Sequence, residues 1–197
     1  MVETTKKLSV LYSTVILFII FSISTTTFSQ FRPSNWAIKK EIQPFFNFYS
    51  INDSVYRSEQ PNSIGMKKLD SIGFKTIINL RNLKSDKHEA LNTNLKLIHV
   101  PINTWTINYD EMVWGIKEIV NAPKPVLVHC KHGSDRTGCI IAGYRIAIQG
   151  WNKTDTINEF RLGGYGFHEA WFRNIIKLLE SINENQLRKD CNTTSIQ

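Results

Sequence analysis

The stretch HCKHGSDRTG, residues 129–138, holds the residues whose types and spacing can do chemistry. An apolar run at 125–128 predicts a buried strand before it, and an apolar run at 139–148 predicts a buried helix after it. Backbone N–H groups in such a loop, and at the start of the helix, bind oxyanions. Cys130 is the candidate nucleophile, because positive surroundings favour its thiolate. Arg136 can bind two phosphate oxygens through its planar guanidinium.

The other side chains of this stretch complete a predicted site for a phosphate dianion. Thr137 can donate its hydroxyl hydrogen to the thiolate, or later to the leaving sulfur. His129 is expected to orient the loop rather than to transfer protons. The residues expected to contact the phosphate are Lys131, His132, Gly133, Ser134, Asp135 and Arg136.

Three further stretches accompany the loop: VYRSEQP at 55–61, GFKTIINLR at 73–81 and QGW at 149–151. Together with His-Cys-x5-Arg-Thr they resemble the cysteine-dependent protein tyrosine phosphatases of the dual-specificity group, in particular its small bacterial periplasmic members. The resemblance spans roughly residues 47–180. It implies a phosphomonoester hydrolase that acts through a phosphocysteine on a phosphorylated protein or a small phosphorylated molecule, with no metal or other cofactor.

The general acid does not follow from the resemblance. In the family, an aspartate on the loop after the strand that ends near Pro101 protonates the leaving oxygen. Here that loop holds no acid, and an ungapped comparison puts Trp105 at the position. An aspartate directly before the arginine resembles the loop of the myotubularin lipid phosphatases. Asp135 is the preferred acid, because it is expected to lie near the bound phosphoryl group. Asp110 is the alternative, although an acidic residue in the first turn of a helix is also explained by the helix dipole.

Two other functions stay open. The missing acid also fits a phosphate-binding protein that has lost catalysis, although the intact Cys130 and Arg136 argue against it. The Asp135 loop, with Lys131 and His132, also fits a phosphatase of inositol phosphates or phospholipids, and the fungal and plant atypical phosphatases share similar motifs.

Other polar residues give weaker signals. His129 and His132 do not predict a metal site, because no further ligand cluster accompanies them. Arg57 and Arg81 end predicted strands on the expected active-site side, where they could contact substrate or pair with carboxylates. His168 has no assigned role.

Composition sets the wider limits. A chain of 197 residues with 42% hydrophobic residues predicts one domain with a core, and a monomer is expected. The net charge of +7 favours anionic ligands, but the lysines form no stripe, so no nucleic-acid partner is expected. Three cysteines argue against a disulfide framework. Cys139 is expected to pack inside its helix and Cys191 to be an exposed thiol.

The N-terminal residues 1–29 are expected to be a secretory signal peptide, or an uncleaved N-terminal anchor. A positive pair precedes an apolar run at 8–23, which is short for a membrane span. The rest of the chain is then extracytoplasmic, and it touches a membrane only if 8–23 stays attached. Residues 30–46 are a lead-in, 47–182 the predicted phosphatase domain and 183–197 a polar, frayed C-terminal tail.

The hydrophobic pattern predicts alternating strands and helices. The strands are expected at 48–50, 54–58, 74–80, 96–100 and 125–129, and the helices at 61–72, 85–94, 108–121, 154–162, 167–181 and directly after the 129–138 loop. This order predicts an α/β fold with a mainly parallel central sheet flanked by helices. The loop would lie at the carboxyl end of a strand, where such sheets bind ligands.

Overall fold

The computed structural model describes residues 32–192, so the expected signal peptide or anchor lies outside the described residues. Every described helix and strand belongs to one unit that begins at Ser34. The elements are β1 (Ile38–Lys39), β2 (Tyr49–Ser50), β3 (Val55–Ser58), α2 (Ser63–Ser71), β4 (Thr76–Arg81), β5 (Lys96–Ile102), α3 (Tyr109–Asn121), β6 (Val126–His129), α4 (Asp135–Ala147), α5 (Lys153–Leu162), α6 (Arg173–Ser181) and α7 (Glu184–Asn192). Among these residues, no helix is long and apolar enough to cross a membrane.

One mixed sheet, mostly parallel, organises the unit, with the strand order β1-β2-β3-β6-β4-β5. The strands β3, β6, β4 and β5 pair in parallel, whereas β1 and β2 add an antiparallel edge. This confirms the predicted α/β fold. The strand β5 runs past Pro101, where the sequence predicted its end, and a proline is tolerated there because β5 is an edge strand.

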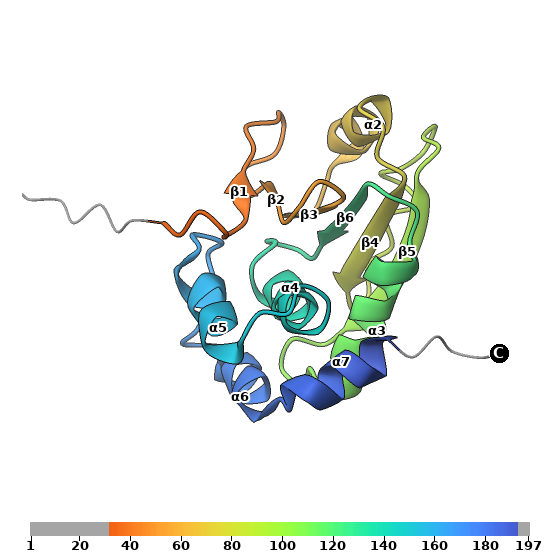
Figure 1. The fold of residues 1–197 in the computed structure, drawn as a ribbon. Helices are drawn as coiled ribbons and strands as arrows, with labels where there is room; N and C mark the ends of the chain where they lie inside the picture. Colours follow the sequence, from red (N-terminus) through yellow and green to blue (C-terminus); the bar gives the residue numbers. More distant parts are fainter. Residues whose placement is uncertain (1–31, 193–197) are drawn as a thin grey trace, which may run out of the picture. The chain divides into compact units, whose positions relative to one another are not determined.

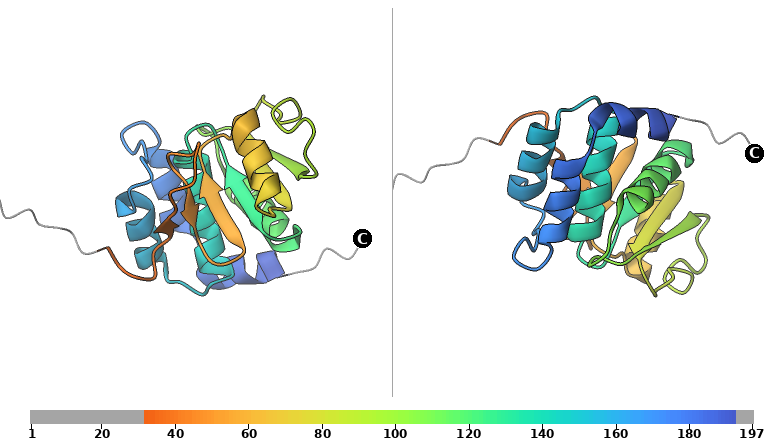
Figure 2. Two further views of the ribbon diagram at one scale, coloured as in Figure 1. Left: turned by 90° about the horizontal axis from the view of Figure 1, so that it is seen from above. Right: turned by 90° about the horizontal axis from the view of Figure 1, so that it is seen from below.

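Helices cover both faces of the sheet (Figures 1 and 2). On one face Met66 and Leu69 of α2 pack with Phe45 of the lead-in and with Phe48, which follows it. On the other face α3 to α7 share the larger core with inward-facing residues of the strands, such as Val126 and Val128. Residues 32–46 are irregular apart from β1, and Phe45 in this stretch is buried.

Helix α4 follows the 129–138 loop and is buried on every side. All of its residues except Arg136 are buried, as expected for a helix surrounded by other elements rather than amphipathic. Cys139 is fully buried, as predicted, and burial raises the pKa of its thiol well above the usual value. A buried, protonated thiol of this kind is chemically inert.

A buried ion pair joins α4 to α5. Arg145 donates to Glu159 from Nε at 2.8 Å and from Nη2 at 2.7 Å. Glu159 also accepts from the Tyr165 hydroxyl at 2.9 Å and from the Ala37 backbone N–H at 2.6 Å. Because buried charges are tolerated only when they are paired, this carboxylate fixes how α5, the loop after it and the lead-in pack around α4.

The predicted helix at 85–94 is wrong. The structure has isolated turns there, and no helix. The side chain of Asp86 is buried and bonded to Arg81 and His129, and Asn92 adopts a positive φ of 62°, which a helix does not allow. Tertiary pairing of one carboxylate therefore overrides the local helical preference.

The C-terminal predictions also need correction. The last predicted helix begins at Arg173 rather than at 167, because the preceding residues form turns. The expected frayed tail contains α7, which buries Leu187 and Cys191. Cys191 is therefore a core residue rather than an exposed thiol, and burial raises its pKa to about 11.

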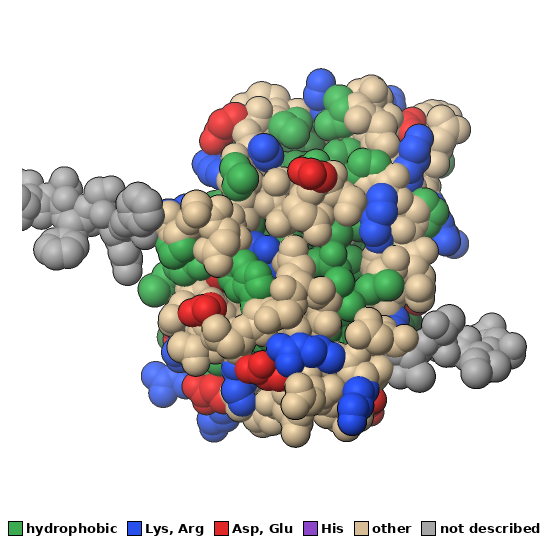
Figure 3. Space-filling model, in the orientation of Figure 1, with side chains coloured by type: hydrophobic (Ala, Val, Ile, Leu, Met, Phe, Trp, Pro, Cys, Tyr) green, Lys and Arg blue, Asp and Glu red, His purple; other side chains and the backbone are tan. Residues whose placement is uncertain are grey.

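The helix starts follow side-chain capping. Asn108 and Glu111 form a capping box at the start of α3. Asn62 caps α2, and Asn152 caps α5. The charged surface is dispersed on the face seen in Figure 3, where Lys and Arg are spread among Asp and Glu around hydrophobic side chains.

The Glu159→Ala variant should lose about 3–5 kcal/mol of unfolding free energy, because it leaves the buried Arg145 charge unpaired. Urea unfolding followed by circular dichroism measures this loss. Glu169→Ala is the matched control, because its partner Arg161 is on the surface and such pairs contribute about 0–1 kcal/mol. Equal losses in the two variants would contradict the structural role of the buried pair.

Candidate active site

The loop between β6 and α4 starts from the middle of the sheet. β6 lies between β3 and β4, and its last residue, His129, pairs with Ser58 and Asn79. Cys130 follows directly, with 1% of its surface exposed. Helix α4 begins at Asp135, so its N-terminal N–H groups face the same space as the loop. The predicted cysteine, loop and helix are therefore brought together.

Arg57 holds the loop from the sheet side. Its Nη2 donates to the carbonyl oxygens of Gly133 at 2.6 Å and Ser134 at 3.5 Å. The guanidinium lies 3.8 Å from the centre of the Tyr165 ring, and burial lowers its pKa. Carbonyls that point toward Arg57 leave the intervening N–H groups free to point the other way. Arg57 thus supports the loop through backbone carbonyls, a role different from the two that the sequence left open.

A second buried network holds the start of the loop. His129 directs Nε2 to Asp86 at 2.7 Å, and its Nδ1 lies 3.1 Å from the carbonyl oxygen of Cys130. Asp86 also accepts from Arg81 at 2.8 Å, and Arg81 donates to Gln60 at 2.6 Å. Asp86, which the sequence analysis assigned to a helix, is therefore the residue that holds His129 in the orienting role predicted for it.

Two donors at the start of α4 have no partner in the described chain. Arg136 Nε and Thr137 Oγ1 are buried and form no hydrogen bond within the described residues. Buried polar atoms are nearly always paired. Donors that stay unpaired beside a cysteine suit an oxyanion and a thiolate, which are the ligands predicted for them.

The segment after α5 completes the site from outside the loop. Ser134 donates from Oγ to the carbonyl oxygen of Tyr165 at 2.7 Å. Asn47 donates to the carbonyl oxygens of His132 at 2.8 Å and Tyr165 at 3.0 Å. Two hollows adjoin these contacts, and His132 and His168 line both of them.

The smaller hollow, about 210 Å³, is the candidate substrate pocket. Its lining comprises Thr104, Lys131, His132, Asp135, Arg136, His168, Trp171 and Phe172. Asp110 is not in this lining; it is exposed in the first turn of α3. The loop expected to carry the acid contributes Thr104, and Asn174 ties it down by donating to the carbonyl oxygens of Thr104 at 2.9 Å and Trp105 at 3.2 Å.

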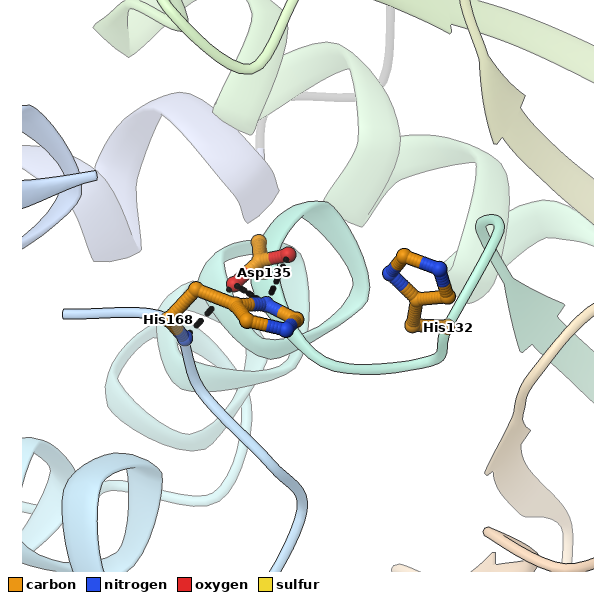
Figure 4. Close-up of side chains that lie close together, drawn as sticks. All are labelled: His132, Asp135 and His168. Carbon is orange, nitrogen blue, oxygen red and sulfur yellow. Dashed lines mark hydrogen bonds and ion pairs between the residues drawn. The ribbon is translucent and has the colours of Figure 1, made fainter. Parts of the chain in front are cut away.

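Asp135 is bonded to a residue that the sequence analysis left without a role. Its Oδ1 accepts from the backbone N–H of His168 at 3.0 Å, and the His168 Nδ1 lies 3.1 and 3.0 Å from the two carboxylate oxygens (Figure 4). His168 is 33 residues away in the chain, so no spacing pattern could reveal the pair. Only the fold brings them together.

His132, Asp135 and His168 also form a group of potential metal ligands, with one ligand atom of each within 4.8 Å of the others. The sequence analysis found no ligand cluster around His129 and His132, whereas the fold places Asp135 and His168 near His132. However, His168 already occupies the Asp135 carboxylate, and Lys131 and Arg136 line the same pocket with positive charge. These charges oppose the binding of a metal cation.

Comparison with known proteins agrees with this geometry. The sequence model of the tyrosine phosphatase family matches residues 42–195. The chain therefore belongs to the tyrosine phosphatase family, as the resemblance of its motifs predicted.

Among curated proteins, the chain is similar to the dual specificity protein phosphatase TpbA of Pseudomonas aeruginosa, with 31% identity over 138 residues, or 68% of this chain and 62% of that protein. It is also similar to inositol diphosphatase DSP5 of Arabidopsis thaliana, with 28% identity over 130 residues, covering 58% and 60% of the two chains. The match thus spans about six tenths of the length of these relatives.

The crystal structure of P. aeruginosa TpbA superposes with a TM-score of 0.74 at 27% identity, covering 82% of this chain and 99% of that one. A TpbA structure in complex with pTyr matches with the same TM-score. The core of the PP-IP phosphatase SIW14 from S. cerevisiae, at 24% identity and a TM-score of 0.64, shares the fold.

Gly133→Ala should disrupt the phosphate loop. Gly133 has a φ of +73°, and an added Cβ would lie 2.5 Å from the backbone of Ser58. We expect binding of the phosphate analogue vanadate, measured by calorimetric titration, to weaken more than tenfold. The matched control is Gly73→Ala, which has a φ of +91° but no atom within 4 Å of the added Cβ. It should cost only the left-handed strain of about 1–2 kcal/mol and leave vanadate affinity unchanged.

Proposed function

We propose that this protein is a phosphomonoester hydrolase that acts through a phosphocysteine, as a protein tyrosine or dual-specificity phosphatase. The observation that carries the proposal is the loop that joins Cys130 to Arg136, because its Gly133 and Ser134 carbonyls are held away from the pocket by Arg57. Inward N–H groups, an arginine and a cysteine at one point form a site for nucleophilic attack on a bound phosphate.

In this mechanism the Cys130 thiolate attacks phosphorus. The loop N–H groups and Arg136 stabilise the equatorial oxygens of the transition state. Asp135 takes part in general acid catalysis, in which the leaving oxygen receives a proton. Thr137 donates to the cysteine sulfur, and water then hydrolyses the phosphocysteine. No metal takes part.

The substrate proposal is a phosphorylated protein side chain, with phosphotyrosine first. The pocket has an apolar side made of Trp171 and Phe172, and Trp105 packs against Phe172 with ring centres 4.8 Å apart. Flat apolar walls suit an aryl ring, and the similar TpbA was solved with pTyr. We also propose that the domain acts as a monomer outside the cytoplasm, delivered by residues 1–29 as a signal peptide or held by 8–23 as an anchor.

The alternative substrate is an inositol phosphate or a phospholipid. Lys131, His132 and Arg136 line the pocket and add positive or polar groups that suit several phosphates. The similar Arabidopsis protein is named an inositol diphosphatase. An assay that gives the same enzyme a phosphotyrosine peptide and an inositol polyphosphate separates the two readings. Tight phosphopeptide binding without turnover would instead indicate a binding protein.

Cys130→Ser should abolish turnover of p-nitrophenyl phosphate, because a serine hydroxyl is a far weaker nucleophile than a thiolate at neutral pH. Stopped assays of released nitrophenol measure the rate, and vanadate should inhibit the wild-type enzyme while EDTA leaves it active. Cys139→Ser is the matched control, because this thiol is packed in the core within α4 and is not part of the loop that joins Cys130 to Arg136. Wild-type turnover by Cys130→Ser would end the proposal.

Asp135→Asn should lower kcat/KM about 10²–10⁴-fold with a poor leaving group, the usual range for general acid catalysis, and much less with an activated aryl phosphate. Asp110→Asn should keep its activity and lose only about 0.3–1 kcal/mol of stability through the helix dipole. Steady-state kinetics with phenyl and p-nitrophenyl phosphate measure the difference. If Asp110→Asn carried the leaving-group-dependent loss, the acid would lie on the 101–110 side of the pocket.

A further inference from the structure

The Asp135 carboxylate is engaged on both oxygens by His168. Oδ1 accepts from the His168 backbone N–H at 3.0 Å, and the ring Nδ1 is within 3.1 Å of Oδ1 and 3.0 Å of Oδ2. The Asp135 side chain is 8% exposed, whereas that of His168 is 46% exposed. A nearly buried carboxylate that accepts two N–H donors acts as an anchor for the imidazole, and it fixes which ring nitrogen is free.

The free nitrogen of His168 is Nε2, which lies on the far side of the ring from Asp135. In Figure 4 this nitrogen is on the side of the ring nearer to His132, whose ring centre is 5.5 Å from that of His168. Both histidines line the pocket together with Lys131 and Arg136. Nε2 is therefore the His168 nitrogen that is available to a ligand in this pocket.

We propose that His168 is the proton donor to the leaving oxygen, and that Asp135 is its positioning residue. The assignment rests on the proposed phosphatase function, and it moves the acid from the aspartate within the loop to a histidine that the fold brings beside it. It supplies the group that residues 101–108 lack.

His168 alone can carry out both proton transfers of the reaction. The Cys130 sulfur forms a bond to phosphorus as the phosphorus–oxygen bond breaks, and the leaving oxygen keeps the bonding pair and takes the proton from Nε2. Neutral His168 then accepts a proton from the attacking water. The water oxygen bonds to phosphorus, the sulfur–phosphorus bond breaks, and the Cys130 thiolate and the protonated His168 are restored.

His132 is a poorer donor than its neighbour. Among the described residues its ring has no hydrogen-bond partner, whereas the ring of His168 is held by a carboxylate. Burial, followed by the charges of Lys131 and His168, lowers the pKa of His132 and favours its neutral form. The groups that face His168 from the surrounding elements are Asp135 and Arg136 of α4, Lys131 and His132 of the loop, and Lys39 of β1 across the larger hollow.

The test compares His168→Gln with wild type on phenyl phosphate and p-nitrophenyl phosphate. We expect kcat/KM for phenyl phosphate to fall about 10²–10⁴-fold, the range of general acid catalysis, and to fall by less than about tenfold for the activated substrate. The alkaline limb of the pH–rate profile for phenyl phosphate should disappear, because the group that must stay protonated is gone. Exogenous imidazole should restore part of the phenyl phosphate activity of His168→Gly.

Two histidine variants serve as controls. His88→Gln changes an exposed histidine outside the described pocket lining and should leave both rates unchanged. His132→Gln removes a pocket residue without removing the proposed donor, and should affect the two substrates equally. A purely structural role of His168 would also lower both rates equally, keep the alkaline limb and give no imidazole rescue.

Several outcomes overturn the assignment. A leaving-group-dependent loss in Asp135→Asn but not in His168→Gln would make Asp135 itself the acid, with the phosphatase function intact because p-nitrophenyl phosphate turnover still depends on Cys130. If EDTA removes wild-type activity and zinc restores it, His132, Asp135 and His168 hold a metal instead. If neither aryl phosphate is turned over in a Cys130-dependent way, the proposed function fails, and this assignment fails with it.

Discussion

The site depends on one constraint: the backbone of the loop after β6 must stay curled with its N–H groups on the inside. A curled loop turns its carbonyls outward, into the protein, where each needs a donor. Arg57 meets that need at Gly133 and Ser134, and burial beneath the Tyr165 ring makes it a fixed group. The loop is thus shaped by contacts on its outer side, and its inner side is left for the ligand.

Charge in the interior follows the same logic. Asp86 joins Arg81 to His129 at the start of the loop, and Glu159 joins Arg145 to the segment that carries Tyr165. Each buried carboxylate ties together parts of the chain that the sheet alone would leave independent. Such networks contribute little net stability over apolar packing, but they are costly to break. Their effect is therefore to select one arrangement of loops around α4.

The sequence predicted what short-range pattern determines. The alternation of apolar runs predicted the parallel sheet, and the spacing of Cys130 and Arg136, with the flanking motifs, predicted the family. The sequence analysis failed at residues whose environment is set by contacts with distant parts of the chain. Asp86 was assigned to a helix because its partner His129 is distant in the sequence. Cys191 was assigned to a tail because its burial against the core leaves no local sequence pattern. His168 was passed over because an isolated histidine carries no signal until the fold places it beside Asp135.

The contacts that shape the loop reach far along the chain. Arg57 and Gly133 are 76 residues apart, and Asp86 and His129 are 43 apart. A peptide that contains only the loop and α4 would lack every one of these contacts, so it would not keep the loop conformation. Oxyanion affinity is instead a property of the completed fold, and an oxyanion that binds only the folded chain must raise the melting temperature of the whole domain. Ligand binding at the proposed phosphate site would therefore report whether the whole domain is folded.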